Sequence, residues 1–403
     1  MKDYGLRWIE FANQTEAQQA LIKIGSSEAG IKLMAGKALG RGIKLEKVPT
    51  RVANILKQEM LAADGDAAVH RDVVVNKIEE SDILLLGTIR QIEHVANKLF
   101  AQPFGLKELG KAIKQLLQTL EPSKQRLLAC RGKELKLGER TLVMGILNLT
   151  PDSFSDGGKF IDIEDAIRQA ERLVKEGADI LDIGAESTRP GHQEVDTEEE
   201  WKRLEPVLKA LAGIPVPISI DTYKAKVASK ALQAGANIIN DIWGLQRDPE
   251  MARVVGDYGA PVVVMHNQNG TQYHHLMGDI FAFLRKSIEL AENHGLAGDQ
   301  IIIDPGIGFG KTNEQNLEVL SRLQEFKTLG KPILLGTSRK STIGKTLDLP
   351  VEERLEGTIA TSVLGVAAGV DIIRVHDVQA NRRAIQMSDA IVRGQRGANY
   401  VGA

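Results

Sequence analysis

Polar side chains follow eight short apolar runs in residues 142–393 of the 403-residue chain. In chain order these polar groups are Asn148 to Thr150, Glu186 to Arg189, Asp221-Thr222, Asn240-Asp241, His266-Asn267, Asp304, Ser338 to Ser341, and Arg374 to His376. One such group could be a helix cap or a turn. Eight together are hard to explain by structure alone, so the sequence predicts a functional face built from them.

The chemistry of these residues divides by charge. A phosphate or pyrophosphate suits the first group, since Arg offers a fork of N–H donors to phosphate oxygens; this group comprises Asn148, Arg189, Arg374 and His376. A flat heterocycle rich in N–H groups suits the second, which supplies acceptors and a donor; it comprises Asp221, Asn240 and Asp304. Lys340 could orient a ring carbonyl or hold an anion. The pattern indicates an aromatic heterocycle that carries a phosphorylated arm.

The apolar runs must be the elements that position these residues. They occupy 143–147, 179–185, 217–220, 238–242, 261–265, 301–304, 332–336 and 372–375. Unbroken apolar runs are typical of strands covered on both faces, as in parallel sheets. Eight strand–helix units over residues 142–393 match a (β/α)8 TIM barrel, in which all the carboxyl ends of the strands meet at one rim. A doubly wound open sheet is the competing fold.

Helix start signals lie between the runs. Thr197-x-x-Glu200 and Thr312-x-x-Gln315 have the spacing of capping boxes, in which the first and fourth residues satisfy each other's backbone N–H groups. They predict helices that begin at these two positions.

The first 125 residues alternate short apolar runs with segments of helical periodicity, and this pattern predicts a small α+β domain of unknown function. Glu121-Pro122-Ser123 breaks the last helical pattern and indicates a boundary. We expect a connecting hairpin over 126–141, with turns at Gly132 and Gly138, then the barrel over 142–393 and a tail over 394–403. No motif assigns a role to the N-terminal domain, for which dimerisation, packing against the barrel and regulation remain open.

Composition excludes several classes of protein. The net charge of −2 gives no electrostatic footprint for nucleic acid or an anionic membrane. The longest weakly polar run, Ala360 to Val370, is too short to span a bilayer. Cys130 is the only cysteine, so no internal disulfide can form. We expect a soluble cytoplasmic protein.

Two tempting motifs have simpler interpretations. Gly306 to Thr312 resembles a phosphate-binding loop, but Pro305 stands where that pattern needs its first glycine. His266, His274 and His275 lack matching cysteines, so we expect surface or loop histidines rather than a metal site.

The motifs themselves carry a family resemblance. Met144 to Gly158 (MGILNLTPDSFSDGG) and Gly184 to Gly191 (GAESTRPG) closely resemble the two signatures of the dihydropteroate synthases. Shorter matches follow in order at 219–224, 239–241, 304–311, 336–341 and 374–376. The resemblance covers residues 129 to about 393, and the N-terminal 125 residues lie outside it.

The resemblance implies a transferase of folate synthesis. It would condense (7,8-dihydropterin-6-yl)methyl diphosphate with para-aminobenzoate and release diphosphate. Sulfonamides would compete with para-aminobenzoate, Mg²⁺ would be the cofactor, and a homodimer would be the expected assembly.

Site roles are also implied by the resemblance. The pterin pocket would comprise Asp221, Asn240, Met265, Asp304 and Lys340. The diphosphate side would comprise Asn148, Thr188, Arg189, Arg374 and His376, with Asn148 also a ligand of Mg²⁺. The para-aminobenzoate side would comprise Thr188, Pro190, Phe309 and Ser341. The catalytic residues would be Asp221, Lys340, Arg374 and His376, with the Asp221 carboxylate beside the positive charge that develops on the pterin.

Two other functions remain open at this point. A pterin-dependent methyltransferase could share Asp221, Asn240 and Asp304, but it would bind methyltetrahydrofolate rather than a diphosphate ester. A barrel that only binds pterins is the second alternative, and its test is whether diphosphate is released.

Overall fold

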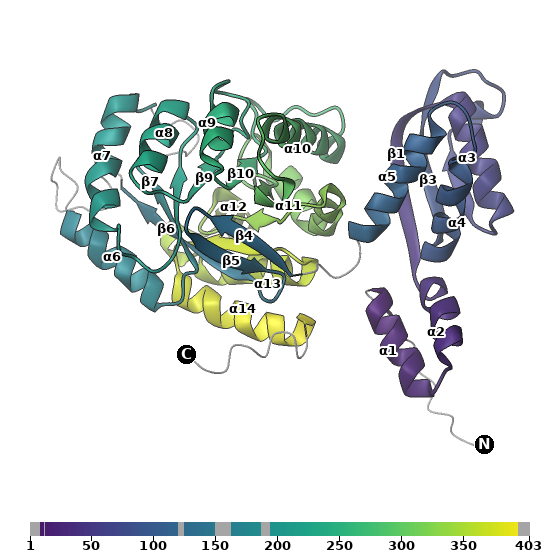
Figure 1. Cartoon of the computed structure of the whole chain (residues 1–403), viewed down its shortest axis with the longest axis horizontal. Helices are drawn as coiled ribbons and strands as arrows, with labels where there is room; N and C mark the ends of the chain where they lie inside the picture. The colour runs from purple at the N-terminus through teal and green to yellow at the C-terminus, as the bar shows by residue number, and fades with distance from the viewer. Residues whose placement is uncertain (1–8, 12, 120–124, 150–162, 187–193, 394–403) are drawn as a thin grey trace. The chain divides into compact units, whose positions relative to one another are not determined.

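The computed structural model describes residues 9–11, 13–119, 125–149, 163–186 and 194–393. The chain divides into two compact units, residues 1–123 and 124–403 (Figure 1). Each unit has its own hydrophobic core and is described separately.

The second unit is built on eight parallel strands. Their bounds are β6 (Leu142–Asn148), β7 (Ile180–Gly184), β8 (Ile218–Asp221), β9 (Ile238–Asp241), β10 (Val262–Met265), β11 (Ile301–Asp304), β12 (Leu334–Leu335) and β13 (Ile372–Val375). They follow the order β11-β10-β9-β8-β7-β6-β13-β12, and a parallel bridge between Ile303 and Ile333 joins the two end strands. The sheet is therefore a closed barrel, as predicted, and each strand overlaps one of the eight apolar runs.

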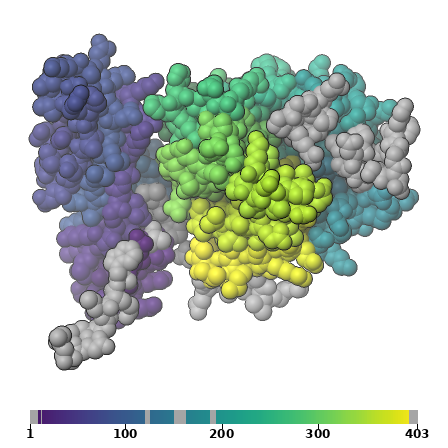
Figure 2. Space-filling model, turned by 180° about the vertical axis from the view of Figure 1, so that it is seen from behind, coloured from purple at the N-terminus to yellow at the C-terminus, as the bar shows by residue number. Residues whose placement is uncertain are grey.

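Helices surround the strands (Figure 1). Their bounds are α6 (Ile163–Lys175), α7 (Thr197–Ala210), α8 (Ala225–Gln233), α9 (Met251–Tyr258), α10 (Leu276–Asn293), α11 (Asn313–Ser321), α12 (Ser341–Leu347), α13 (Leu355–Ala368) and α14 (Val378–Arg393). The segments coloured lime to yellow, which include the last of these helices, lie at the surface of this unit in Figure 2.

One of the two predicted capping boxes is confirmed. Thr312 caps α11 and exchanges hydrogen bonds with Gln315. The other is wrong by one residue, because Asp196 is the N-cap of α7 and accepts from the Glu198 N–H. Glu200 is buried and turns its carboxylate to Lys224 instead of to the helix start.

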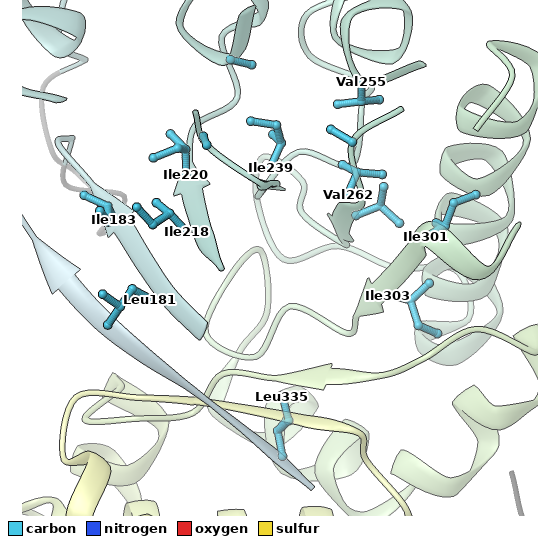
Figure 3. Close-up of a cluster of buried hydrophobic side chains, with 14 of the residues drawn as sticks. Leu181, Ile183, Ile218, Ile220, Ile239, Val255, Val262, Ile301, Ile303 and Leu335 are labelled. Carbon is cyan, nitrogen blue, oxygen red and sulfur yellow. The ribbon is translucent and has the colours of Figure 1, made fainter. Parts of the chain in front are cut away.

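Side chains of the strands alternate between two buried layers. One layer packs between strands and helices, where Leu181, Ile183, Ile218, Ile220 and Ile239 lie side by side (Figure 3). The other fills the barrel, and its members include Met144, Ile180, Ile238, Val263, Ile302, Leu334 and Ile372. Burial on both faces explains why these strands read as continuous apolar runs.

A hairpin covers the amino ends of the strands. It consists of β4 (Arg126–Cys130) and β5 (Lys133–Leu137), and its Leu128 and Leu137 pack into the layer inside the barrel. The turn residues Arg131 and Gly132 both have positive φ, which suits a tight two-residue hairpin turn. We call this end of the barrel the floor, and the end formed by the carboxyl ends of the strands the mouth.

The N-terminal unit is an α+β fold, as predicted. Its antiparallel sheet has the order β1-β3-β2, with β1 (Gly40–Pro49), β2 (Asp66–Val69) and β3 (Glu80–Thr88). Its helices are α1 (Gln14–Ile24), α2 (Glu28–Met34), α3 (Thr50–Ala62), α4 (Ile89–Leu99) and α5 (Leu106–Thr119). Alternate residues of β3, namely Ile83 and Leu85, join apolar faces of α3, α4 and α5 in one core.

Within the described residues, no helix is both long enough and apolar enough to cross a bilayer.

Candidate active site

A buried acid inside strand β7 organises one side of the mouth. Asp182 is fully buried and accepts hydrogen bonds from Ser219 Oγ at 2.6 Å and from Asn240 Nδ2 at 3.1 Å. It also accepts from Arg374 Nε at 2.6 Å. The side chains of β7, β8, β9 and β13 therefore converge on one carboxylate.

Arg374 also reaches the end of β8. Its Nη2 lies 2.7 Å from Asp221 Oδ2, so one guanidinium bridges Asp182 and Asp221. Burial disfavours the charged guanidinium, but the two acids outweigh this effect and hold the pKa of Arg374 above its usual value. This fork of donors is well matched to two carboxylates.

The second oxygen of Asp221 has no such partner. Asp221 Oδ1 is buried and, among the described residues, no donor lies within hydrogen-bond distance. Burial raises the pKa of Asp221, Asp182 and Glu200 add to the shift, and Arg374 and Lys340 oppose it. An acceptor that is buried and unsatisfied is costly for folding and available to a ligand.

The other side of the mouth combines an acid and a lysine. Asp304, at the end of β11, is buried, and burial raises the pKa of its carboxyl group. Lys340 Nζ donates to the Ile307 carbonyl at 2.5 Å and lies 4.6 Å from the centroid of the Phe309 ring. Burial lowers the pKa of Lys340 to about 8.

Two more predicted residues lie at strand ends. The His376 Nδ1 atom is 3.0 Å from Ser338 Oγ, which also accepts from the His376 backbone N–H and so fixes the position of the ring. Met265 is buried in an apolar cluster with Tyr223 and Ile242, against which Phe309 packs. An apolar wall therefore adjoins the polar groups.

In the part of the chain that the structure describes, no hydrogen bond links the remaining predicted residues to the buried acids, lysine and histidine of the mouth. Asn148 ends β6, where it pairs with Gly184 of β7. Ser341 is exposed at the first position of α12, directly after Lys340. Thr188, Arg189 and Pro190 lie outside the described residues.

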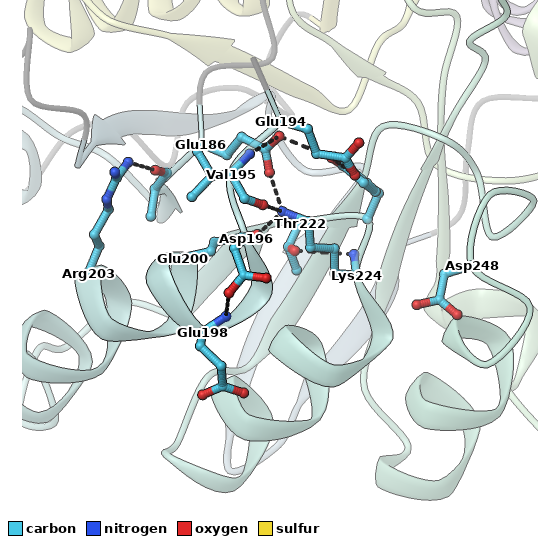
Figure 4. Close-up of polar contacts among 12 residues, drawn as sticks. Glu186, Glu194, Val195, Asp196, Glu198, Glu200, Arg203, Thr222, Lys224 and Asp248 are labelled. Atoms are coloured by element: carbon cyan, nitrogen blue, oxygen red, sulfur yellow. Dashed lines mark hydrogen bonds and ion pairs between the residues drawn. The ribbon is translucent and has the colours of Figure 1, made fainter. Parts of the chain in front are cut away.

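A buried charge cluster holds the two chain segments that flank residues 187–193. Lys224 Nζ lies 2.5 Å from Glu186 Oε2, 2.5 Å from the Val195 carbonyl oxygen and 2.7 Å from Glu200 Oε2 (Figure 4). The Tyr223 hydroxyl group bonds to Glu186 and to Glu194. The residues after Asp221 thus tie Glu186 to the chain that resumes at Glu194.

His266 lies in the loop directly after β10, as expected, but it is buried there. It is 2% exposed and its Nδ1 lies 2.8 Å from Lys311 Nζ, whereas His274 and His275 are exposed as expected. Burial lowers the pKa of His266 to about 2, and the charge of Lys311 adds to the shift. The neighbouring lysine and the Phe283 ring, 5.0 Å away between centroids, explain why this imidazole is accommodated inside the protein.

Sequence reasoning missed Asp182, although a signal was present. This aspartate interrupts the apolar run DILDIGA, at a place where a structural strand would hold an aliphatic residue. Among the described residues, no group of three or more His, Cys, Asp or Glu side chains is arranged to hold a metal ion.

Comparisons with known proteins agree with this geometry. Residues 144–376 match the family described as pterin binding enzyme. The dihydropteroate synthase of Clostridium beijerinckii is 56% identical over 264 residues, which cover 65% of this chain and 98% of that protein. A probable bifunctional folylpolyglutamate synthase/dihydropteroate synthase of Halobacterium salinarum is 39% identical over 382 residues, covering 93% of this chain and 46% of that protein. This second match includes much of the N-terminal unit as well as the barrel.

Solved structures give the same result. A Clostridium difficile dihydropteroate synthase, crystallised in the presence of pteroic acid, superposes with a TM-score of 0.63 at 57% identity and covers 64% of this chain and 98% of its own. The Yersinia pestis dihydropteroate synthase, in complex with a sulfonamide drug, has a TM-score of 0.62 at 41% identity, with coverages of 66% and 99%.

Proposed function

The chain belongs to the pterin-binding enzymes, as a dihydropteroate synthase, and we propose that two sets of polar side chains in its barrel mouth bind the two ends of the pterin substrate. The enzyme is a transferase that condenses (7,8-dihydropterin-6-yl)methyl diphosphate with para-aminobenzoate to 7,8-dihydropteroate and diphosphate. We assign the roles of the individual residues as follows from their contacts and burial.

The unsatisfied oxygen of Asp221 carries the proposal for the pterin pocket. A pterin ring presents N–H donors along one edge, and Asp221 Oδ1 is a buried acceptor without a donor in the described structure. Asn240 and Asp304, also buried, would bind the same edge, with Met265 against the ring face and Lys340 at the ring carbonyl. This arrangement favours a planar heterocycle rich in N–H groups.

The diphosphate would lie on the side of Arg374 and His376. Two of the five N–H donors of Arg374 are used by Asp182 and Asp221, which leaves the rest of the guanidinium for phosphate oxygens. Ser338 holds the His376 ring in place for a second contact. Thr188 and Arg189 are assigned to the same side from their sequence match.

Mg²⁺ fits this site only together with the substrate. The candidate protein ligand is one amide oxygen, that of Asn148, and Mg²⁺ commonly combines a few protein oxygens with substrate phosphates and water. When bound, the ion would neutralise charge on the leaving diphosphate.

Catalysis then follows from the placement of charge. Departure of diphosphate from the methylene carbon leaves a cation delocalised into the pterin, and the Asp221 carboxylate stabilises it. Arg374 and His376 stabilise the negative charge of the leaving group. The weakly basic arylamine needs positioning rather than a strong base, and Thr188, Pro190, Phe309 and Ser341 are assigned to its site, where a sulfonamide would compete.

A cytoplasmic homodimer is part of the proposal. Three large apolar side chains are exposed on neighbouring helices, namely Leu364 of α13 and Met387 and Ile391 of α14, and a second copy could cover them. A single cysteine in the whole sequence is compatible with a reducing compartment. Size-exclusion chromatography with light scattering tests the dimer, which Ile391→Asp should weaken.

Diphosphate release from the pterin diphosphate, para-aminobenzoate and Mg²⁺ tests the function. We expect turnover by the intact chain, and at least about a hundredfold loss in Asp221→Asn. Asp257→Asn is the matched control, because Asp257 pairs with Arg253 on the exposed surface of α9. Methyl transfer from methyltetrahydrofolate without diphosphate release would instead support the methyltransferase alternative.

A further inference from the structure

Lys311 is a buried lysine to which the proposed mechanism gives no role. It follows the loop after β11 and is 9% exposed. Its Nζ donates to the Gly306 carbonyl at 2.9 Å and to the Phe309 carbonyl at 3.2 Å, and lies 2.8 Å from His266 Nδ1. A methionine of similar length would fill this space without the cost of burying an amino group.

The amino group can satisfy its partners in either protonation state. Burial is the main cause that lowers the pKa of Lys311 to about 7; Asp304 opposes the shift and Lys340 adds to it. As an ammonium ion, Lys311 donates to both carbonyls and to His266 Nδ1. As a neutral amine, it donates to the carbonyls and accepts from a protonated Nδ1 of the neutral imidazole. The contacts therefore persist on both sides of neutral pH.

The loop from Pro305 to Lys311 is held by hydrogen bonds from side chains to its backbone carbonyls. Gly306, Gly308 and Gly310 all have positive φ, and a Cβ at Gly306 would overlap with the His266 carbonyl oxygen. Side chains bind four of its carbonyls: Lys311 binds those of Gly306 and Phe309, Lys340 binds that of Ile307, and the Tyr273 hydroxyl donates to that of Gly310 at 2.7 Å.

Two of the groups in this loop contact Lys340. Ile307 provides the carbonyl that accepts from Lys340 Nζ, and the Phe309 ring lies 4.6 Å from the same atom. Lys311 binds the carbonyls of Gly306 and Phe309. Ile307 lies between these two residues in the sequence, and Phe309 is one of them. The position of Lys340 is therefore set by a loop whose shape depends on Lys311.

We propose that Lys311, with His266, is a positioning residue that holds the 305–311 loop so that Ile307 and Phe309 place the Lys340 amino group and shape the adjoining amine site. This inference rests on the proposed function of Lys340 and Phe309. Lys311 itself contacts neither substrate in this account.

The barrel offers a matched control for this lysine. Lys133, on the floor, also donates from Nζ to two carbonyls, those of Ile214 and Val216, each at 2.7 Å. Both lysines thus hold two backbone carbonyls, one at each end of the same barrel. A merely structural role for Lys311 predicts that Lys311→Met and Lys133→Met behave alike.

The test compares kcat/KM for diphosphate release in the full-length enzyme. We expect Lys311→Met to lower kcat/KM for both substrates by about 10- to 100-fold, as for residues that support a catalytic group. Lys133→Met should stay within about twofold of wild type while its melting temperature falls. Equal kinetic effects in the two variants, or unchanged kcat/KM in Lys311→Met, would overturn the proposal.

A pH profile separates positioning from general destabilisation. The charged groups that face Lys311 are Asp304 from β11 and Lys340. Lys340 also faces Asp221 from β8 and Arg374 from β13, and His266 after β10 is neutral. Burial lowers the pKa of Lys311 to about 7 and that of Lys340 to about 8, so Lys311 loses its charge first as the pH rises. In Lys311→Met the loop should move, so that the hydrogen bond from Lys340 Nζ to the Ile307 carbonyl is lost. Because this bond stabilises the ammonium form, its loss should lower the pKa of Lys340 and move the basic limb of kcat/KM to lower pH. An unmoved limb contradicts the proposal.

A second variant covers the case in which Lys311→Met does not fold. His266→Leu removes one partner of Lys311, and we expect at least a threefold fall in kcat/KM with the same shift of the basic limb. His294→Leu, at an exposed position after α10, is the control. Wild-type kinetics in folded His266→Leu would count against the proposal, whereas absence of turnover in the wild-type enzyme would refute the proposed function instead.

Discussion

The floor and the mouth of the barrel are made by the same eight strands, but their charged side chains differ in how fully their hydrogen bonds are satisfied. On the floor, Arg131 donates to the carbonyls of Leu232 and Ala236 and Lys133 to those of Ile214 and Val216, near the ends of α7 and α8. In the mouth, Asp221 keeps one oxygen that accepts from no donor in the described part of the chain, and burial displaces the pKa values of Asp304 and Lys340.

The difference shows where the fold accepts a cost in stability. Charges on the floor bind a carbonyl in the last turn of α8 and carbonyls in the loops that follow α7 and α8, which stabilises the barrel. Charges in the mouth are buried before a ligand is present to satisfy them, as expected at a site that binds and polarises a substrate. Changes at the two ends should therefore have separable effects.

The largest effect should come from Arg374→Met. The change leaves Asp182 and Asp221 buried without their shared cation, and breaking such a pair costs about 3–5 kcal/mol. It should also abolish diphosphate release. Urea unfolding and kinetics on one preparation measure both losses, and Arg253→Met, whose ion pairs are exposed, should change neither by much.

Leu128→Ala should separate stability from catalysis on the floor. Leu128 is fully buried in the layer inside the barrel, and truncation of such a side chain costs about 2–5 kcal/mol. Because Leu128 lies far from the mouth, kcat/KM at a temperature where the variant is folded should remain within about threefold. A large kinetic loss in the folded variant would show that the two ends are coupled.

The pH dependence of kcat/KM should report the charges of the mouth. Loss of the Asp221 carboxylate on acidification gives an acid limb, which lies above the usual Asp range because the pKa of Asp221 is raised. Loss of the Lys340 ammonium gives a basic limb near pH 8. The residual activity of Asp221→Asn should lack the acid limb; a limb that persists unchanged belongs to another group.

The smallest effect should be at Cys130. This thiol is fully buried on the floor, and burial raises its pKa to about 12, so the reactive thiolate is scarce. We expect no labelling by a thiol reagent in the native enzyme and full activity after exposure to it. Labelling in urea is the positive control, and rapid labelling of the native protein would contradict this packing.

The sequence predicted the barrel well because the signal is local. Each strand is covered on both faces, so runs such as VVVM at 262–265 and IIID at 301–304 could be recognised without knowing their neighbours. The polar residue after each run then belonged to the mouth by the geometry of parallel strands.

The missed features depend on contacts between distant segments. Asp182 lies inside an apolar run, and its role was missed because only the closed barrel brings its hydrogen-bond donors Arg374 and Asn240 to it. The burial of His266 in its loop was not predicted, because Lys311, 45 residues later, provides its polar partner. The N-cap of α7 is Asp196 rather than the predicted Thr197, because the Glu200 carboxylate binds Lys224 instead of closing a capping box. The roles of the individual site residues, including Thr188, Arg189 and Pro190, stay predictions.

The most direct test of the division between mouth and floor is kcat/KM for diphosphate release, measured side by side for folded Asp221→Asn and Leu128→Ala. We predict a loss of at least about a hundredfold for Asp221→Asn and a value within about threefold of wild type for Leu128→Ala. Equal losses, or full activity in Asp221→Asn, would contradict the claim that the chemistry resides in the buried charges of the mouth.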